Sequence, residues 1–235
     1  MKLMSFNTQH CKNFITQTID YAVMAQAIQN CGADIVGLNE MRDTGSVGSY
    51  DKQVSMLSEL TGLSHHYFAK AIEIGGDMPY AYGNGFLSNI PIVSAEVIPV
   101  PDPPVRREGG RHYETRCLLK AKLENGLTVL VIHFGLNPEE AANAAQTVCE
   151  HLVDEKCILM GDFNVTPDNP VLAPIRARMK DTADFFTAPR FSYPSDAPNR
   201  KIDYIFVSPD IEVISADIPA VVASDHRPHT AEIKL

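Results

Sequence analysis

Apolar runs that end abruptly in polar residues recur along this chain. In the clearest case, the apolar residues 158–160 are followed by Gly161, Asp162, Phe163 and Asn164. Such a run predicts a strand that is covered on both faces. Gly161 permits a close backbone approach, and Asp162 and Asn164 alternate onto one side of the chain while Phe163 points to the other. An acid and an amide at a strand end could hold a water, a metal or a phosphate, although a simple turn also uses these residues.

The same reading of apolar spacing and turn signals predicts the other elements. Helical spacing and cap residues predict helices at residues 18–30, 53–60, 137–153 and 168–179. Strands are expected at residues 2–6, 34–38, 66–74, 85–87, 92–100, 114–123, 127–133, 158–163, 202–207, 211–216 and 230–234. A strand–helix–strand order occurs in the first third of the chain and again after its middle. We therefore expect an α/β fold in a single domain over residues 1–235, with two similar halves packed sheet against sheet.

Composition and charge narrow the function classes. The chain has 235 residues, of which 45% are hydrophobic, and this suffices for a sizeable core. Its net charge of −9 gives an overall field that repels polyanions. No basic stripe marks an extended nucleic-acid surface, although a local cationic pocket for one anionic group is compatible with this charge.

The cysteines indicate a reducing compartment. The chain has five, an odd number, and their spacing matches no metal or redox motif. Most lie inside apolar runs, namely Cys31, Cys117, Cys149 and Cys157. Buried free thiols, and with them a cytoplasmic location, are expected. We expect no signal peptide, because residues 1–7 already read as the first strand, and no apolar run is long enough to span a membrane.

The polar residues at the strand ends form one set, which is Asn7, Glu40, His133, Asp162, Asn164, Asp203, Asp225 and His226. Any one of them alone is readily explained as a cap or turn residue, but the repetition favours a shared site. Carboxylate and amide oxygens favour Mg²⁺ or Mn²⁺ over zinc. Asp203 is expected to orient His226 and support its charged form, or else to cap a turn. Metal, acid and imidazole together suit the hydrolysis of a phosphate ester.

A series of motifs resembles, in order and spacing, the endonuclease/exonuclease/phosphatase superfamily along nearly the whole chain. They are Ser-Phe-Asn (5–7), Asp-Ile-Val-Gly-Leu-Asn-Glu (34–40), Ile-His-Phe (132–134), Gly-Asp-Phe-Asn (161–164), Lys-Ile-Asp-Tyr-Ile-Phe (201–206) and Ser-Asp-His-Arg-Pro (224–228). The resemblance implies a four-layer α/β/β/α sandwich with two packed mixed sheets and a divalent metal, Mg²⁺ or Mn²⁺. One departure is Asn39, where the family usually has Gln, and we expect it to cost little activity.

The resemblance also implies roles for the matching residues. Glu40 would be the main metal ligand, and Asn7 and Asp225 would complete the surroundings of the metal. Asp162 and Asn164 would position the attacking water and the phosphate.

The two histidines follow the same pattern. His226, supported by Asp203, would bind the phosphate or serve in acid–base catalysis. His133 would contact the phosphate or the leaving group. The general acid and the general base are not assigned to particular residues.

Three further residues are candidates for substrate binding. Arg111 lies in a loop over residues 102–111 that is rich in Pro, Gly and Arg, and this loop is either solvated or an anion clamp. Arg116 resembles an arginine near the pocket of some relatives. Asn84 precedes a segment that resembles the strand entering the family's site.

The sequence therefore predicts a magnesium-dependent phosphoesterase that hydrolyses a small or exposed phosphate ester by in-line attack of water. A DNA or RNA nuclease of the same superfamily is the alternative among enzymes, and the charge of −9 argues against it. A family member that binds a ligand without catalysis is the alternative of another class, and the complete residue set argues against that.

Overall fold

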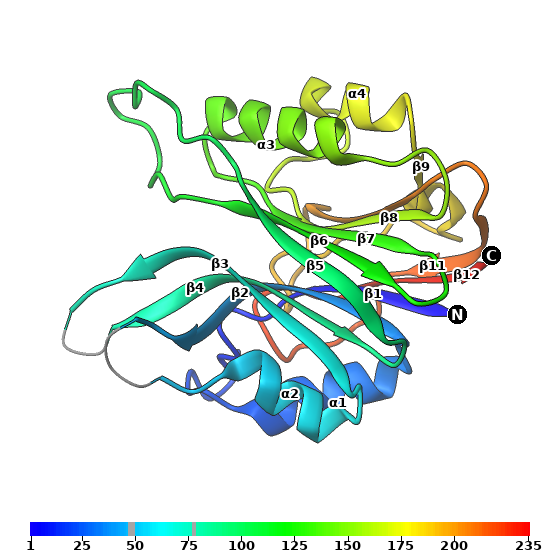
Figure 1. Ribbon diagram of the computed structural model, residues 1–235, viewed down its shortest axis with the longest axis horizontal. Coiled ribbons are helices and arrows are strands. Elements are labelled where there is room, and N and C mark those ends of the chain that lie inside the picture. The colour runs from blue at the N-terminus through cyan, green and yellow to red at the C-terminus, as the bar shows by residue number, and fades with distance from the viewer. Residues whose placement is uncertain (47–49, 77–78) are drawn as a thin grey trace.

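Two mixed β-sheets stack face to face in the computed structural model, which describes residues 1–46, 50–76 and 79–235 (Figure 1). The first sheet contains β1 (Lys2–Asn7), β2 (Ile35–Thr44), β3 (His65–Ile74), β4 (Tyr80–Ser88), β11 (Glu212–Asp217) and β12 (His229–Lys234), in the order β11–β12–β1–β2–β4–β3. The second contains β5 (Ile92–Pro99), β6 (Cys117–Leu123), β7 (Thr128–His133), β8 (Cys157–Asp162), β9 (Lys180–Asp181) and β10 (Asp203–Val207), in the order β5–β6–β7–β8–β10–β9.

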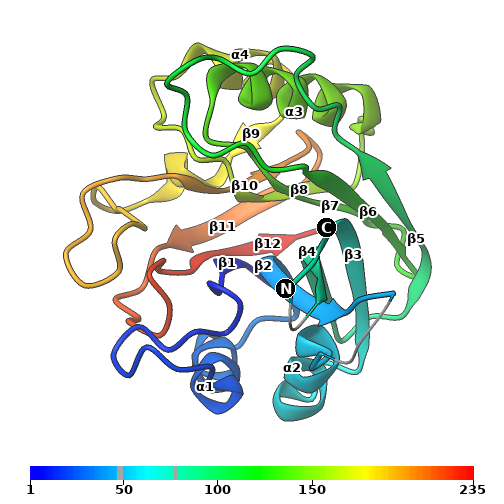
Figure 2. The same cartoon turned by 90° about the vertical axis from the view of Figure 1, so that its left-hand side faces the viewer.

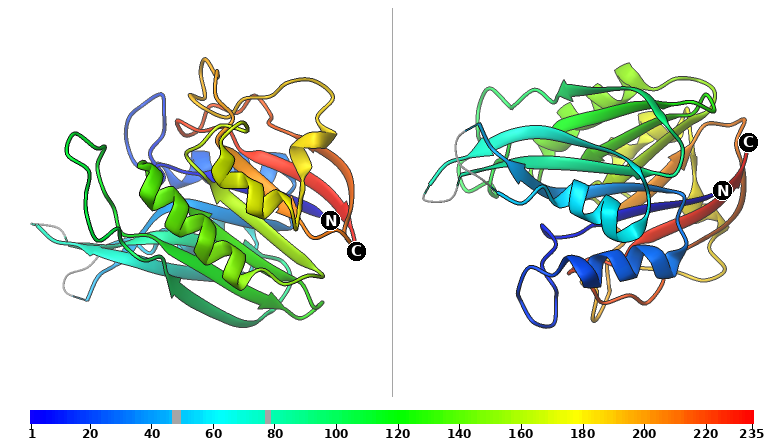
Figure 3. Two further views of the ribbon diagram at one scale, coloured as in Figure 1. Left: turned by 90° about the horizontal axis from the view of Figure 1, so that it is seen from above. Right: turned by 60° about the horizontal axis from the view of Figure 1, so that its bottom comes forward.

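Helices cover the outer face of each sheet (Figures 2 and 3). The helices α1 (Tyr21–Cys31) and α2 (Gln53–Thr61) pack on the first sheet, and α3 (Pro138–His151) and α4 (Ala173–Arg176) pack on the second. Two 3₁₀ turns, at Pro170–Leu172 and Thr182–Phe185, complete the regular structure of the described residues. The predicted four-layer α/β/β/α sandwich is confirmed.

Continuous apolar runs arise because the central strands are buried on both faces. In β1, Leu3 joins the core between the two sheets, whereas Met4 packs toward the helices below. In β8, Met160 faces the other sheet and Leu159 faces the α3 side. The strands β1 and β2 are parallel, as are β7 and β8, so the carboxyl ends of these strands lie at the same edge of their sheets.

Cap residues set two helix starts. The helix α1 begins at Tyr21, later than expected, because the Asp20 side chain accepts a hydrogen bond from the Val23 N–H at 3.1 Å and caps the helix. The helix α3 begins at Pro138 as predicted, with Asn137 as its cap and Glu140 completing a capping box.

The prediction of a continuous helix over residues 168–179 is wrong. A 3₁₀ turn over Pro170–Leu172 and the single helical turn α4 take its place. Pro174 has no N–H, so it cannot donate to the carbonyl of Pro170, and a continuous helix is interrupted there. The short strand β9 that follows, paired with β10, was not predicted.

The observed limits of two strands also differ from the predicted ones. The strand expected from residue 114 begins at Cys117, because the N–H of Glu114 donates to Glu140 Oε1 on α3 at 3.1 Å. In contrast, β4 extends well beyond the expected residues 85–87, because it pairs with both β2 and β3.

Gly161 lies where the backbones of β7 and β8 meet. Its φ is +151°, and a Cβ atom there would be 1.8 Å from the carbonyl oxygen of Ile132. The close approach expected at this glycine is thus confirmed, and it holds the end of β8 against the end of β7.

We expect Gly161→Ala to lower the free energy of unfolding by about 3 kcal/mol or more, because the added methyl group overlaps backbone atoms that cannot move separately. Gly32→Ala is the matched control: Gly32 also has a positive φ, of +62°, but a Cβ there meets nothing within 4 Å. Denaturant unfolding of both variants checks the prediction, and equal losses of stability would contradict it.

All five cysteines lie in the described residues, and all are unpaired. Cys149 is half-buried and the others are buried, close to expectation. Within the described ranges, no helix combines the length and the apolar character that a membrane crossing requires.

Candidate active site

A cavity of about 400 Å³, hereafter the catalytic cavity, is lined by residues at the ends of β7 and β8, by Glu40 within β2 and by the segment before β12. The predicted site residues that line it are Glu40, Arg111, Arg116, His133, Asp162, Asn164, Asp225 and His226. Asn7, Asp203 and Asn84 lie outside this lining, as buried residues. Segments from both sheets therefore line one cavity.

A β-bulge places Glu40 at the cavity. The pairing of β2 with β4 shifts register between Leu38 and Met41, and Glu40 within the bulge has a φ of +61°. A bulge redirects a side chain at the cost of local strain, which is common next to active sites. The amide of Asn7 then holds Glu40 in place, because its Nδ2 donates to Glu40 Oε1 at 3.0 Å.

The orientation of Asn7 does not agree with the expected metal-ligand role. Its Oδ1 accepts the N–H of Gln9 at 3.0 Å, and its Nδ2 donates to both Glu40 and Asp162 Oδ2, each at 3.0 Å. An amide nitrogen cannot ligate a cation, so the atom that faces the acids is a donor. In this arrangement Asn7 positions two carboxylates, and its expected role as a metal ligand stays a prediction.

Glu40 and Asp225 have the chemistry of a divalent-cation site. Both carboxylates line the catalytic cavity. Burial raises the pKa of Glu40, the Asn7 hydrogen bond opposes that rise, and the charge of Asp225 adds to it. Repulsion between two acids in one cavity is what a bound cation relieves. The oxygen-only donors fit Mg²⁺ or Mn²⁺.

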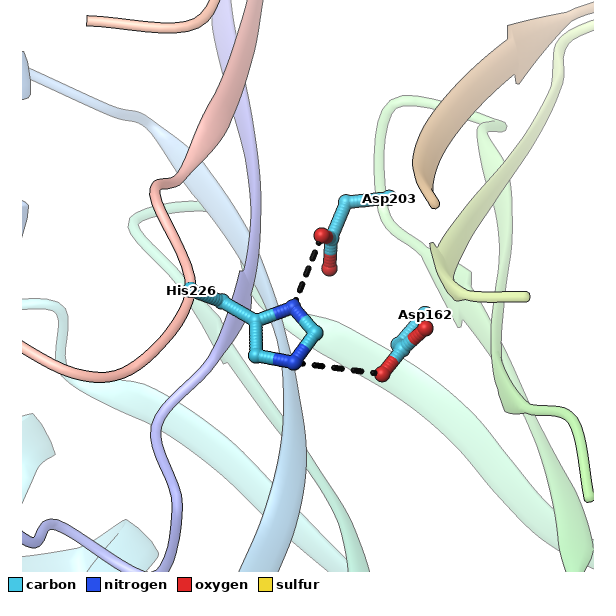
Figure 4. Close-up of side chains that lie close together, drawn as sticks. All are labelled: Asp162, Asp203 and His226. Atoms are coloured by element: carbon cyan, nitrogen blue, oxygen red, sulfur yellow. Dashed lines mark hydrogen bonds and ion pairs between the residues drawn. The ribbon is translucent and has the colours of Figure 1, made fainter. Parts of the chain in front are cut away.

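Asp203, His226 and Asp162 form a charge network in which each ring nitrogen of His226 faces one carboxylate (Figure 4). The Nδ1 of His226 is 2.8 Å from Asp203 Oδ2, and its Nε2 is 3.7 Å from Asp162 Oδ2. Burial disfavours the charged imidazolium, yet the carboxylates of Asp203 and Asp162 raise the pKa of His226 to about 10. The predicted pairing of Asp203 with His226 is therefore present.

These three side chains are also close enough together to be a candidate metal cluster. However, both ring nitrogens of His226 face carboxylates and, in the imidazolium form, both carry protons. Neither nitrogen then offers a lone pair to a cation. We interpret the cluster as an ion-pair network and place the candidate metal site at Glu40 and Asp225.

Arg116 helps to keep the ring of His133 neutral. The Nη1 of Arg116 is 3.0 Å from His133 Nδ1, and it also forms an ion pair with Glu114 at 2.6 Å. A guanidinium can only donate, so a positively charged donor faces Nδ1 of His133. Burial, followed by the charge of Arg116, lowers the pKa of His133 well below its usual value and keeps the ring neutral.

A carboxylate and an amide face His133 Nε2. Asp162 Oδ2 lies 3.5 Å from this nitrogen. The Asn164 Nδ2 is nearer, at 3.1 Å, and it is a donor that also donates to the carbonyl of Phe134 at 3.0 Å. His133 is therefore a neutral ring at the centre of the site, with a donor near each of its two nitrogens.

Asn84 does not reach the cavity, so its expected substrate contact is corrected. It is 2% exposed, its Oδ1 accepts from Asn39 Nδ2 at 2.8 Å, and its Nδ2 donates to the carbonyl of Cys117 at 2.9 Å. Asn39, the departure from the family pattern, bridges the two sheets: its Nδ2 also donates to Ile132 O, and its Oδ1 accepts from the Asp162 N–H.

Sequence reasoning missed cavity residues in the segment before β10. The ring of Tyr193 lies 4.9 Å from the ring of His226, and the guanidinium of Arg200 lies 4.7 Å from the ring of Tyr193. Arg200 directly precedes the Lys-Ile-Asp motif, so adjacency to that motif was a usable signal. Tyr193 carried no signal in the sequence.

Comparison with known proteins identifies a family model. The model, described as Endonuclease/Exonuclease/phosphatase family, matches residues 4–226. No match was found among curated protein sequences.

Solved structures share the fold. An endonuclease/exonuclease/phosphatase from Beutenbergia cavernae DSM 12333 has a TM-score of 0.76 and 20% identity, covering 100% of this chain and 71% of the other. The mannosyl-6-phosphatase Bt3783 of Bacteroides thetaiotaomicron VPI-5482 has a TM-score of 0.73 and 18% identity, covering 100% of both chains. Truncated Caenorhabditis elegans TDP2 has a TM-score of 0.64 and 15% identity, covering 100% of this chain and 97% of the other.

Proposed function

The chain belongs to the endonuclease/exonuclease/phosphatase family, whose members hydrolyse phosphate esters, and we propose that it is a Mg²⁺- or Mn²⁺-dependent phosphoesterase acting on a small or exposed phosphate ester. The observation that carries this proposal is the meeting of two kinds of group in one cavity: carboxylates suited to a cation, and donors suited to a phosphate. On the basis of its unpaired cysteines, we also propose a cytoplasmic location.

Glu40 and Asp225 would hold the cation, and Asp162 would orient the attacking water. The cation, when bound, would neutralise charge on the phosphate oxygens. Burial raises the pKa of Asp162, so its carboxylate is a better proton acceptor than an exposed aspartate. Asn7 Nδ2 donates to Asp162 Oδ2 at 3.0 Å. The same oxygen lies 3.5 Å from His133 Nε2 and 3.7 Å from His226 Nε2.

The remaining groups would bind the phosphate as it gains charge. His226 is held as an imidazolium by Asp203, and burial and the charge of Arg116 keep His133 neutral by lowering its pKa. Arg116 also lines the cavity and can donate to a phosphate oxygen. Donors placed in advance where charge develops stabilise the transition state without reorganisation.

The acidic surface predicts a preference for small esters over long nucleic acid. With a net charge of −9, the chain is expected to bind duplex DNA only weakly, even at low salt. The test is to compare phosphomonoesters, phosphodiesters, single strands and duplexes as substrates with Mg²⁺ and with Mn²⁺. Sub-micromolar duplex binding with a steep salt dependence would instead favour a nuclease.

A further inference from the structure

A second cavity, of about 690 Å³, lies beside the catalytic cavity. The two cavities share lining residues, which are Arg111, Leu136, Asn164, Arg200 and Ile202. Ligand pockets of this size accommodate whole small molecules. The two cavities therefore adjoin, and a group attached to a phosphate in the catalytic cavity would lie near the residues that border both.

The second cavity is cationic, although the chain as a whole is acidic. Among the described residues, the charged side chains lining it are Arg107, Arg111 and Arg200, with no acid. The catalytic cavity, in contrast, also contains acids, which are Glu40, Glu114, Asp162 and Asp225. In a chain of net charge −9, a cavity whose charged groups are all arginines favours an anionic group.

Arg111 and Arg200 are held at the boundary between the two cavities. The backbone of Arg111 is fixed to the start of α3, where its N–H donates to Asn137 Oδ1 at 2.8 Å and its carbonyl accepts from Asn137 Nδ2 at 3.2 Å. The guanidinium of Arg200 lies over the ring of Tyr193. A stacked guanidinium keeps its N–H groups at its edge, where an anion can accept them.

Arg107 is partly neutralised. Its Nη2 is 3.3 Å from Glu139 Oε2, so part of its charge is already balanced. Arg111 and Arg200 therefore carry most of the attraction for an anion. Apolar side chains complete the lining, including Leu136, Ala141 and Val171, and these suit the carbon skeleton of a ligand.

We propose that the second cavity binds the part of the substrate beyond the scissile phosphate, and that this part is a sugar-sized group bearing a second phosphate. The inference rests on the proposed function for the position of the scissile phosphate. The carbon skeleton would contact the apolar lining while the second phosphate accepts hydrogen bonds from Arg111 and Arg200.

Matched pairs of esters test this inference. Glucose 6-phosphate and glucose 1,6-bisphosphate differ only by the second phosphate, as do adenosine 5′-phosphate and adenosine 3′,5′-bisphosphate. We expect kcat/KM for at least one bisphosphate to exceed that of its partner by about tenfold to a hundredfold, as charge-assisted bonds to arginine imply. Calorimetric binding of the same pairs to Asp162→Asn with Mg²⁺ provides a second readout, since it needs no turnover.

Charge-matched variants locate the effect. Arg111→Gln and Arg200→Gln are each expected to reduce the bisphosphate preference about tenfold, while the monophosphate changes less. Arg106→Gln is the control: it removes the same charge from the same loop, but Arg106 lines neither cavity and lies 5.5 Å from the ring of Tyr113. It should leave the preference unchanged.

The outcomes separate the two proposals. Hydrolysis of both members of each pair with equal kcat/KM and equal affinity would overturn the subsite and leave the proposed function standing. Binding of the bisphosphates that is tighter and depends on Arg200, without turnover of any ester by the wild type, would support the subsite and contradict the phosphoesterase. A preference equally reduced by Arg106→Gln would show long-range charge only and overturn the subsite.

Discussion

Replacing Glu40 by Gln is expected to weaken activation by Mg²⁺ at least about 100-fold and to lower kcat/KM by a similar factor or more. The change removes one negative charge from the cavity and preserves the shape of the side chain. Because Asn7 Nδ2 donates to Glu40 Oε1, a glutamine oxygen can still accept that hydrogen bond, so the fold should persist. Excess chelator should likewise abolish turnover by the wild type, and Mg²⁺ or Mn²⁺ should restore it.

Metal titration with calorimetric and activity readouts checks this expectation. Glu59→Gln is a suitable control, since it removes the same charge from an exposed position on α2. Unchanged Mg²⁺ affinity in Glu40→Gln, or full wild-type activity in excess chelator, would show that Glu40 is not a metal ligand.

Asp203→Asn is expected to lower the rate by about 10²–10⁴ while the protein stays folded. Asp203 Oδ2 is 2.8 Å from His226 Nδ1, and its charge is the largest of the effects that raise the pKa of His226. Without that charge, the pKa of the imidazole falls and the cation is lost at lower pH. The alkaline limb of the pH–rate profile should therefore move toward neutral pH.

The pH–rate profile separates this role from simple support of the fold. Asp181→Asn is the control, because Asp181 is also a buried acid, paired with Arg176 at 3.2 Å, but lies outside the catalytic cavity. It should cost stability without moving the profile. Near-identical rates and profiles for wild type and Asp203→Asn would show that Asp203 is structural and that His226 works alone.

Most of the fold was predictable because central strands buried on both faces read as unbroken apolar runs. The run before Gly161 and the helix begun by Asn137 are examples in which local chemistry and tertiary packing agree. Predictions failed where a single contact decided the outcome. Pro174 interrupted a helix that the cap signals favoured, and the Glu140 side chain captured the backbone of Glu114.

The site was predictable as a set of residues but not as a geometry. The motifs named Glu40, Asp162 and His226 as one set, and these three side chains line the same cavity. The direction of the Asn7 amide depends on the N–H of Gln9, a contact that exists only in the folded turn. The place of Arg200 depends on stacking against Tyr193, which sequence spacing does not encode.

Hydrolysis of a phosphate ester is the activity that we assign to the carboxylates and donors lining the catalytic cavity. The most direct test measures Mg²⁺-dependent hydrolysis of a phosphomonoester and a phosphodiester by purified wild type and Asp162→Asn, with circular dichroism confirming that both are folded. We expect turnover of at least one ester by the wild type and a rate about 10³-fold lower, or more, in the variant. Equal rates in the two proteins, for both esters, would contradict it.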